Sequence, residues 1–194
     1  LGLPARSAVN IPGLSAELME RLKPHLQLSE TLGLLASQLS GGQVNDLEVR
    51  LQGDFAQYPP QPIVIATLKG LLSSALGERI NYVNASLEAK ARGIHVLEVK
   101  DEASRDFAVG SLQITSSGDS GEHRVTGTVF PDGGLRITGI DEFPVNVSPS
   151  QHMLFTRHRD MPGIIGQLGS LLGEHNVNIA SMQVGRKIVR GDAV

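Results

Sequence analysis

The chain has 194 residues, and its 17 Lys and Arg against 20 Asp and Glu leave a net charge of -3. This balance gives no strong positive field, which disfavours a general nucleic-acid binder. The absence of cysteine excludes a disulfide framework, a thiolate zinc site and a cysteine nucleophile. No apolar run approaches the roughly 18 residues of a membrane span, and we expect no signal peptide. Because aromatic residues make up only 4% of the chain, an aliphatic core is predicted.

Both ends of the sequence suggest a piece of a longer protein. The first residue is Leu1 rather than Met, and the segment 188–194 stops where an apolar strand begins. Residues 1–13 hold two prolines and no usable period, which predicts an extended lead-in.

Helices are predicted in the first part of the chain. Ser15 is an N-cap candidate for a short helix that we expect to end near Pro24. A second helix is predicted from an apolar stripe at helical spacing, ended by Gly41. Its members are Leu28, Leu32, Leu35 and Leu39. A third helix is predicted to open at Pro62 and to end at Gly77, and a fourth over residues 86–92.

Alternating and apolar segments predict a sheet. Residues 47–51 alternate apolar and polar side chains, which is typical of a strand with one wet face. Four more strands are expected over residues 94–99, 107–115, 123–130 and 135–140, with Gly-rich turns between the later ones. The sequence therefore predicts an α+β domain over residues 14–148, with helices on one face of an antiparallel or mixed sheet.

The pattern resets at residues 148–150. A strand over 152–158, a helix over 162–174 and a strand over 177–186 form a β-α-β unit. We place this second, smaller unit at residues 149–194.

No known catalytic motif is present. The sequence has no GxGxxG after a strand, no phosphate loop and no nucleophile elbow. Its six histidines are scattered without metal-ligand spacing. We therefore expect neither a bound metal nor catalysis in this segment.

The turn from residue 157 to residue 163 is the candidate binding site. Pro162 fits the first helical position, Gly163 lets a ligand approach the backbone, and a helix N-terminus attracts a carboxylate. Asp160 could accept an ammonium group, and Asn178 offers both a donor and an acceptor. Together they suit a small amino acid. In the simpler alternative, Asp160 caps the helix, Asn178 serves a turn and His158 is a solvated strand end.

Glycines gather on one side of the predicted helix 162–174. Gly166, Gly169 and Gly173 lie opposite its apolar face, and each interior glycine costs about 0.8–1.0 kcal/mol against alanine. Either another backbone approaches this side closely, or an exposed helix tolerates small residues there.

The run 153–166, followed by Asn176-Val177-Asn178-Ile179, resembles the opening of an ACT domain. The whole chain resembles the C-terminal regulatory part of the long-form D-3-phosphoglycerate dehydrogenase family. The further motifs that carry this resemblance are residues 6–10, 68–72, 82–85, 91–93 and 181–186. Residues 14–148 would be the intervening, allosteric substrate-binding domain. Residues 149–194 would be the first half of a ferredoxin-like ACT domain.

The resemblance implies a function. The family oxidises 3-phospho-D-glycerate with NAD in the first committed step of serine synthesis, and its ACT domains bind L-serine as feedback inhibitor between two subunits. By position, serine would contact the side chains of His158, Asp160 and Asn178 and the backbone of Met161, Pro162 and Gly163. The resemblance places the NAD site and the catalytic residues outside this segment. It also implies a cytoplasmic homodimer or homotetramer with no nucleic-acid or membrane partner.

The resemblance also suggests an anion or substrate effector of the intervening domain. Lys69, Arg79, Lys90 and Arg92 could hold it through charge-assisted contacts. The simpler alternative for each of them is a solvated charge on a helix. Two other functions stay open: a structural assembly module without ligand, and the regulatory domain of an L-serine dehydratase. Because half an ACT sheet exposes an edge and apolar surface, we expect another chain to cover this end or the end to be poorly ordered.

Overall fold

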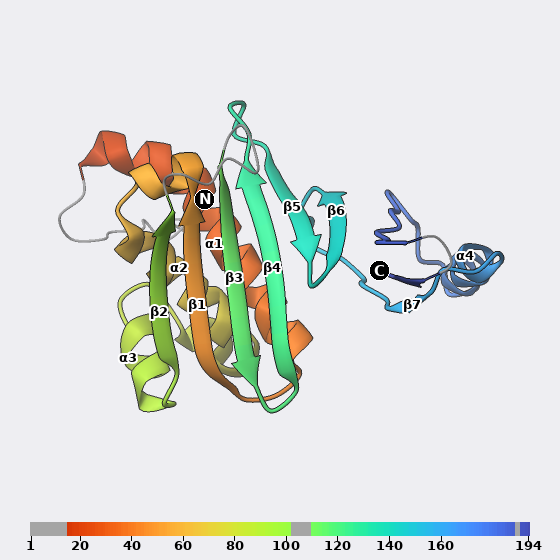
Figure 1. Cartoon of the computed structure of the whole chain (residues 1–194), viewed down its shortest axis with the longest axis horizontal. Helices are drawn as coiled ribbons and strands as arrows, with labels where there is room; N and C mark the ends of the chain where they lie inside the picture. The colour runs from red at the N-terminus through yellow and green to blue at the C-terminus, as the bar shows by residue number, and fades with distance from the viewer. Residues whose placement is uncertain (1–14, 102–109, 189–190) are drawn as a thin grey trace, which may run out of the picture.

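A computed structural model describes residues 15–101, 110–188 and 191–194 of the chain (Figure 1). Its main feature is a six-stranded sheet in the order β2-β1-β3-β4-β5-β6. The strands are β1 (Val44–Gln52), β2 (His95–Asp101), β3 (Ser111–Gly118), β4 (Gly121–Val129), β5 (Leu135–Ile140) and β6 (Phe143–Val147). The β1–β2 pair is parallel and the other pairs are antiparallel. The predicted α+β fold with a mixed sheet is confirmed, while the lead-in 1–13 and the start of the predicted strand 107–115 lie outside the described residues.

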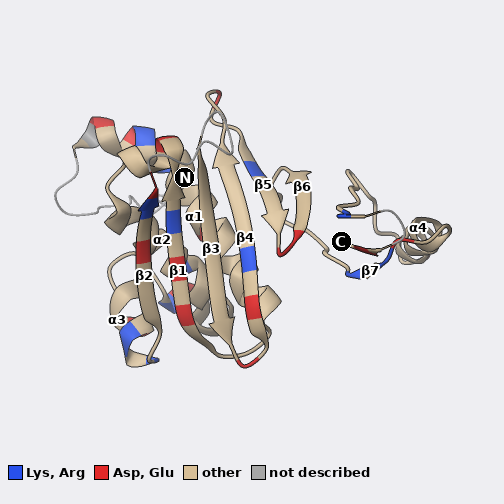
Figure 2. Cartoon of the chain, in the orientation of Figure 1, with Lys and Arg blue, Asp and Glu red and all other residues tan. Residues whose placement is uncertain are grey.

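Helices α1 (Ala16–Ser40) and α2 (Pro60–Leu76) cover one face of the sheet, and α3 (Ala85–Ala91) lies near its β2 end (Figure 1). The predicted alternation holds in β1, because Leu47, Val49 and Leu51 are fully buried beneath the helices. Charged residues of both signs lie along β1 and β4 (Figure 2). In β1, Glu48 and Arg50 alternate with the buried residues, so they lie on the other face, where they pair at 2.9 Å. This face is therefore wet, as the sequence pattern indicates.

The prediction that the first helix ends near Pro24 is wrong, because α1 runs through this residue without a break. Proline in a helix interior costs about 3 kcal/mol. Leu22 and Leu26 flank Pro24 and are both buried, and burying a leucine contributes roughly 1.5–3 kcal/mol each. Burial of these leucines in the core therefore outweighs the local penalty. The two helix ends are as predicted, with Ser15 as N-cap and Gly41 as a left-handed C-cap.

Two glycines allow α1 and α2 to cross at close range. A Cβ on Gly33 or Gly70 would lie well within 3.0 Å of a backbone carbonyl oxygen of the other helix. Beside this crossing the Lys69 ammonium pairs with Glu30 and lies 4.8 Å from the centre of the Tyr82 ring. Burial, together with the nearby Glu30 carboxylate, raises the pKa of Tyr82. The motifs at 68–72 and 82–85 therefore meet at one packing contact.

The final strand of the sheet, β6, is absent from the sequence prediction. Pro144 lies inside it, and proline within an apolar run argues against a strand. In the fold β6 pairs only with β5 at the end of the described sheet, where a missing N–H is tolerated.

The segment after residue 148 forms less sheet than predicted. It contains β7 (His158–Arg159), α4 (Ile164–Glu174) and β8 (Asp192–Ala193). The predicted strand 152–158 is reduced to its end, and the predicted strand 177–186 is wrong, because only Arg186 forms a bridge, to Ala193. Residues 191–194 lie between β7 and Gly185, and their backbone forms hydrogen bonds with both. Without a neighbouring strand, the described residues 177–184 cannot form a ladder.

His25 predicts a pH dependence of folding stability. Its ring lies on α1 with its centre 4.8 Å from the centre of the Phe55 ring and 4.4 Å from that of Tyr58. Burial lowers the pKa of His25, and its hydrogen bond to the Arg21 carbonyl opposes this shift only in part. The unfolded chain therefore takes up the proton first, so stability is complete above pH 6.5 and declines as the pH falls through that value.

We expect a lower urea midpoint at about pH 5 than at about pH 7.5. His25→Gln should reduce this difference. The exposed His152 provides the control, because His152→Gln should leave it unchanged. Equal differences in the wild type and in His25→Gln would contradict the assignment.

Candidate effector site

Asp160 is the centre of the turn that leads from β7 to α4. Its backbone N–H donates to the Gly191 carbonyl at 2.8 Å, which ties the turn to the C-terminal residues. Its carboxylate oxygen Oδ2 accepts a hydrogen bond from Arg186 Nη1 at 2.9 Å. The Asp160 side chain remains 20% exposed. The turn therefore presents a carboxylate and a guanidinium side by side at the surface.

Asp160 does not cap α4, which removes one reading of the sequence. The N-cap is Gly163, with φ +94° and no side-chain hydrogen bond. The prediction that Pro162 occupies the first helical position is also wrong, because the helix begins at Ile164. A left-handed N-cap favours glycine, and a Cβ there would meet nothing within 4 Å. The space beside Gly163, where the helix begins, is therefore open.

His158 lies in β7, at the start of the turn. Its Nδ1 lies 3.0 Å from the Arg159 carbonyl oxygen. Because a carbonyl only accepts, Nδ1 carries a proton and Nε2 remains available. Met161 is exposed beside it.

Asn178 is not joined to this turn. It follows the C-terminal end of α4, and its side chain is exposed with no hydrogen bond in the described part of the chain. The structure brings His158, Asp160 and 161–163 together, and Asn178 stays a prediction.

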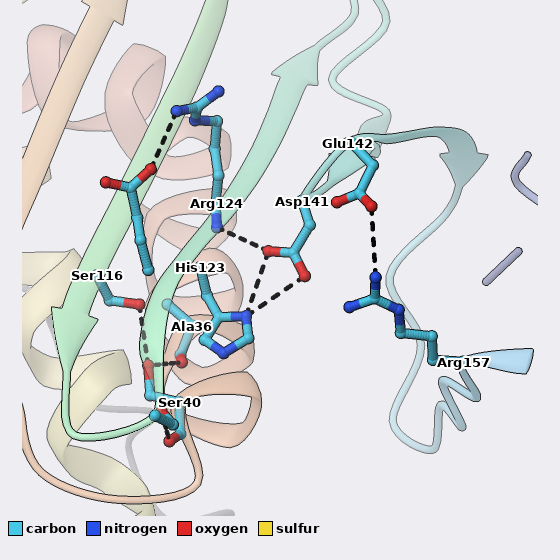
Figure 3. Close-up of polar contacts among 10 residues, drawn as sticks. Ala36, Ser40, Ser116, His123, Arg124, Asp141, Glu142 and Arg157 are labelled. Atoms are coloured by element: carbon cyan, nitrogen blue, oxygen red, sulfur yellow. Dashed lines mark hydrogen bonds and ion pairs between the residues drawn. The ribbon is translucent and has the colours of Figure 1, made fainter. Parts of the chain in front are cut away.

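Sequence reasoning missed Arg186 and the contacts that Arg157 makes outside the turn. Arg186 is 26 residues from Asp160, and no spacing rule connects them. Arg157 Nη2 lies 3.4 Å from Glu142 (Figure 3). The same nitrogen lies 3.6 Å from Asp192, and the Arg157 guanidinium carbon lies 5.7 Å from the centre of the Phe143 ring. The contacts with Arg186 and Asp192 depend on how the chain after α4 returns to β7, and the contact with Glu142 depends on the β5–β6 turn. No local sequence pattern shows either arrangement.

The ACT-like segment exposes much of its apolar surface. Helix α4 buries no residue, and a Cβ on Gly166, Gly169 or Gly173 would meet nothing within 4 Å. Within the described chain, no backbone approaches this glycine side. Large apolar side chains exposed by more than half are Leu154, Met161, Leu171 and Ile188.

The four cations of the predicted anion site have different surroundings. Lys69 is paired with Glu30, and Arg92 is paired with Glu88. Arg79 and Lys90 are exposed. A cavity of about 320 Å³ lies between α1, α2 and the start of β1, and its apolar lining includes Leu71, Leu72 and Ile94. Of the four cations, only Arg92 lines this cavity. The anion site stays a prediction.

A search of the described residues finds no group of three or more His, Asp and Glu side chains able to hold a metal. None of their helices is both long and apolar enough to cross a membrane.

Comparison with known proteins assigns each part of the chain to a domain type. The model of the D-3-phosphoglycerate dehydrogenase intervening domain matches residues 21–141, and the ACT domain model matches residues 152–193. A D-3-phosphoglycerate dehydrogenase from Synechocystis sp. is 63% identical over 100% of the chain. Those from Bacillus subtilis and Archaeoglobus fulgidus are 35% and 37% identical over 100% and 95% of it. The chain spans only 35–37% of the length of these relatives.

Proposed function

The chain belongs to the D-3-phosphoglycerate dehydrogenase intervening-domain family, and from this premise we propose that it is the regulatory part of such an enzyme, sensing L-serine through its ACT segment. The oxidation of 3-phospho-D-glycerate with NAD would belong to the rest of the protein. The proposal is carried by the Asp160–Arg186 pair, which lies at the surface just before α4.

The charges of this pair complement those of a free amino acid. The ammonium group of the amino acid would bind the Asp160 carboxylate. The carboxylate of the amino acid would bind the Arg186 guanidinium and the N–H groups of the first turn of α4. The His158 Nε2 would accept a hydrogen bond from the serine hydroxyl. A zwitterion with a short polar side chain uses all of these groups at once.

The exposed apolar residues favour self-association as part of the same function. Leu154, Leu171 and Ile188 are 64%, 53% and 68% exposed, and apolar surface of this kind is typical of a protein interface. A second copy would cover it and could supply Asn178 to its partner's site. The same surface also suits an assembly module without ligand, which is the alternative to serine sensing.

The experiment uses the natural protein that carries this chain. We expect L-serine to inhibit its oxidation of 3-phospho-D-glycerate. D-serine should have little effect, because its opposite chirality prevents the ammonium, carboxylate and hydroxyl groups from reaching their three partners at the same time. Removal of the residues from Ser150 onward should abolish the inhibition. Full activity at saturating L-serine, in a protein that assembles normally, would leave the assembly module as the function.

A further inference from the structure

The β5–β6 hairpin at the end of the sheet connects the intervening domain to the ACT segment. The chain passes directly from β6 into the segment that leads to β7 (Figure 1). The pairing of β5 shifts its register at Thr138 on both sides, toward β4 and toward β6. Such irregularities bend a strand and increase its twist. At the same residue the Thr138 hydroxyl is buried and has no hydrogen-bond partner among the described residues.

The turn of this hairpin is held in an unfavourable conformation by β4. Asp141 has φ +50°, a region that residues with a Cβ disfavour and that Asp tolerates better than most. Its N–H donates to the Arg124 carbonyl at 2.6 Å, and its carboxylate accepts the Arg124 N–H at 3.0 Å. His123 Nδ1 lies 3.3 Å from both carboxylate oxygens (Figure 3). Several contacts with two adjacent residues of β4 thus fix one strained residue.

The ACT segment contacts the same hairpin at the next residues. Arg157 pairs with Glu142, which follows Asp141 in the turn, and lies over the Phe143 ring. Gln183 Oε1 accepts the backbone N–H of Asn146 at 2.8 Å. Gly185 packs so closely on β6 that a Cβ would lie 2.7 Å from a side-chain carbon of Val145. Movement of the ACT segment therefore changes the forces on the hairpin turn.

We propose that the β5–β6 hairpin is the coupling element of this protein. Its lock is the set of contacts that Asp141 makes with Arg124 and His123, and Arg157 is the residue through which the ACT segment acts on it. In the locked state the Asp141 side chain holds the turn to β4. When Arg157 withdraws from Glu142, the turn loses its outer support, and the strain at Asp141 favours its release from β4. The role of the hairpin in regulation rests on the proposed function, but the coupling itself can be tested without any effector.

The test measures hydrogen exchange of the Arg124 and Asp141 amides in the whole chain by NMR. Exposed ion pairs contribute about 0.2–1 kcal/mol, so Arg157→Gln should speed exchange at Arg124 by roughly 1.4- to 5-fold. Asp141→Gly permits the left-handed turn but removes the carboxylate. In the Asp141→Gly variant, adding Arg157→Gln should leave the exchange rate of the Arg124 amide unchanged.

Two matched controls separate coupling from general loosening. Asp141→Asn keeps a side-chain acceptor and tolerates the same φ, so the response to Arg157→Gln should persist. Arg159→Gln alters an exposed arginine of β7 and should not change exchange at Arg124. The proposal would be overturned if Arg157→Gln did not change the exchange rate of the Arg124 amide in the otherwise wild-type chain. It would also be overturned if Arg157→Gln changed that rate equally in the Asp141→Gly variant. If exchange is coupled but L-serine does not inhibit, the proposed function fails and the coupling element stands.

Discussion

Replacing Gly70 with alanine is expected to destabilise the six-stranded unit by about 3 kcal/mol, at the upper end of overpacking effects. The added Cβ would overlap the Glu30 carbonyl oxygen, and backbone atoms cannot move aside as a flexible side chain can. The helices must therefore separate where α1 meets α2, which weakens the Lys69–Glu30 pair beside the crossing. The measurement is the urea midpoint, followed by circular dichroism at constant m-value.

Gly42 provides the control within the same unit. It is exposed, and a Cβ there would meet only the Ser40 carbonyl oxygen at 3.7 Å. Gly42→Ala should therefore change stability by less than about 0.5 kcal/mol. If Gly70→Ala were tolerated as well as Gly42→Ala, the close crossing of α1 and α2 would be contradicted.

Removing the Asp160 carboxylate is expected to weaken L-serine binding by roughly 10- to 150-fold. This range corresponds to the loss of one charged hydrogen bond of about 1.5–3 kcal/mol. Asp160→Ala also leaves Arg186 without its carboxylate partner at 2.9 Å, so the positive charge faces the ligand ammonium unbalanced. Calorimetric titration of L-serine into the wild-type and variant chains measures both affinities.

Asp192 provides a matched control for the loss of one carboxylate. It lies in β8, adjacent to β7, and pairs with Arg157 at 3.6 Å rather than with Arg186. Asp192→Ala removes the same charge close to the turn and should leave L-serine affinity within about twofold, because it removes no proposed ligand contact. Equal losses in Asp160→Ala and Asp192→Ala would indicate a general charge effect instead of a site.

The sequence predicts the layered part of the fold because its signals there are local. The alternation in β1, the stripe in α1 and the capping by Ser15 and Gly41 each involve residues within one element. The errors arise where distant packing decides. Helix α1 continues through Pro24 because the leucines around it are buried in the core. Residues 177–184 form no strand because, within the described chain, residues 191–194 pair with β7 and with Gly185 and Arg186 only.

The candidate site divides in the same way. The turn 158–163 is predictable because its residues are contiguous and a helix follows. Its partner Arg186 and the link from Arg157 to Glu142 join segments 26 and 15 residues apart. Those contacts depend on the return of the chain to β7 and on the unpredicted strand β6. The spacing of residues in the sequence predicts neither the return of the chain to β7 nor strand β6.

The central claim is that the ACT segment binds serine at the Asp160 turn, and one titration tests it most directly. L-serine is titrated into the intact chain and into a chain that ends at Val147, which retains the whole six-stranded sheet. We predict saturable heat for the intact chain, and none for the shortened chain or for D-serine. Equal heats from both chains, or no heat from the intact chain at millimolar L-serine, would contradict the account.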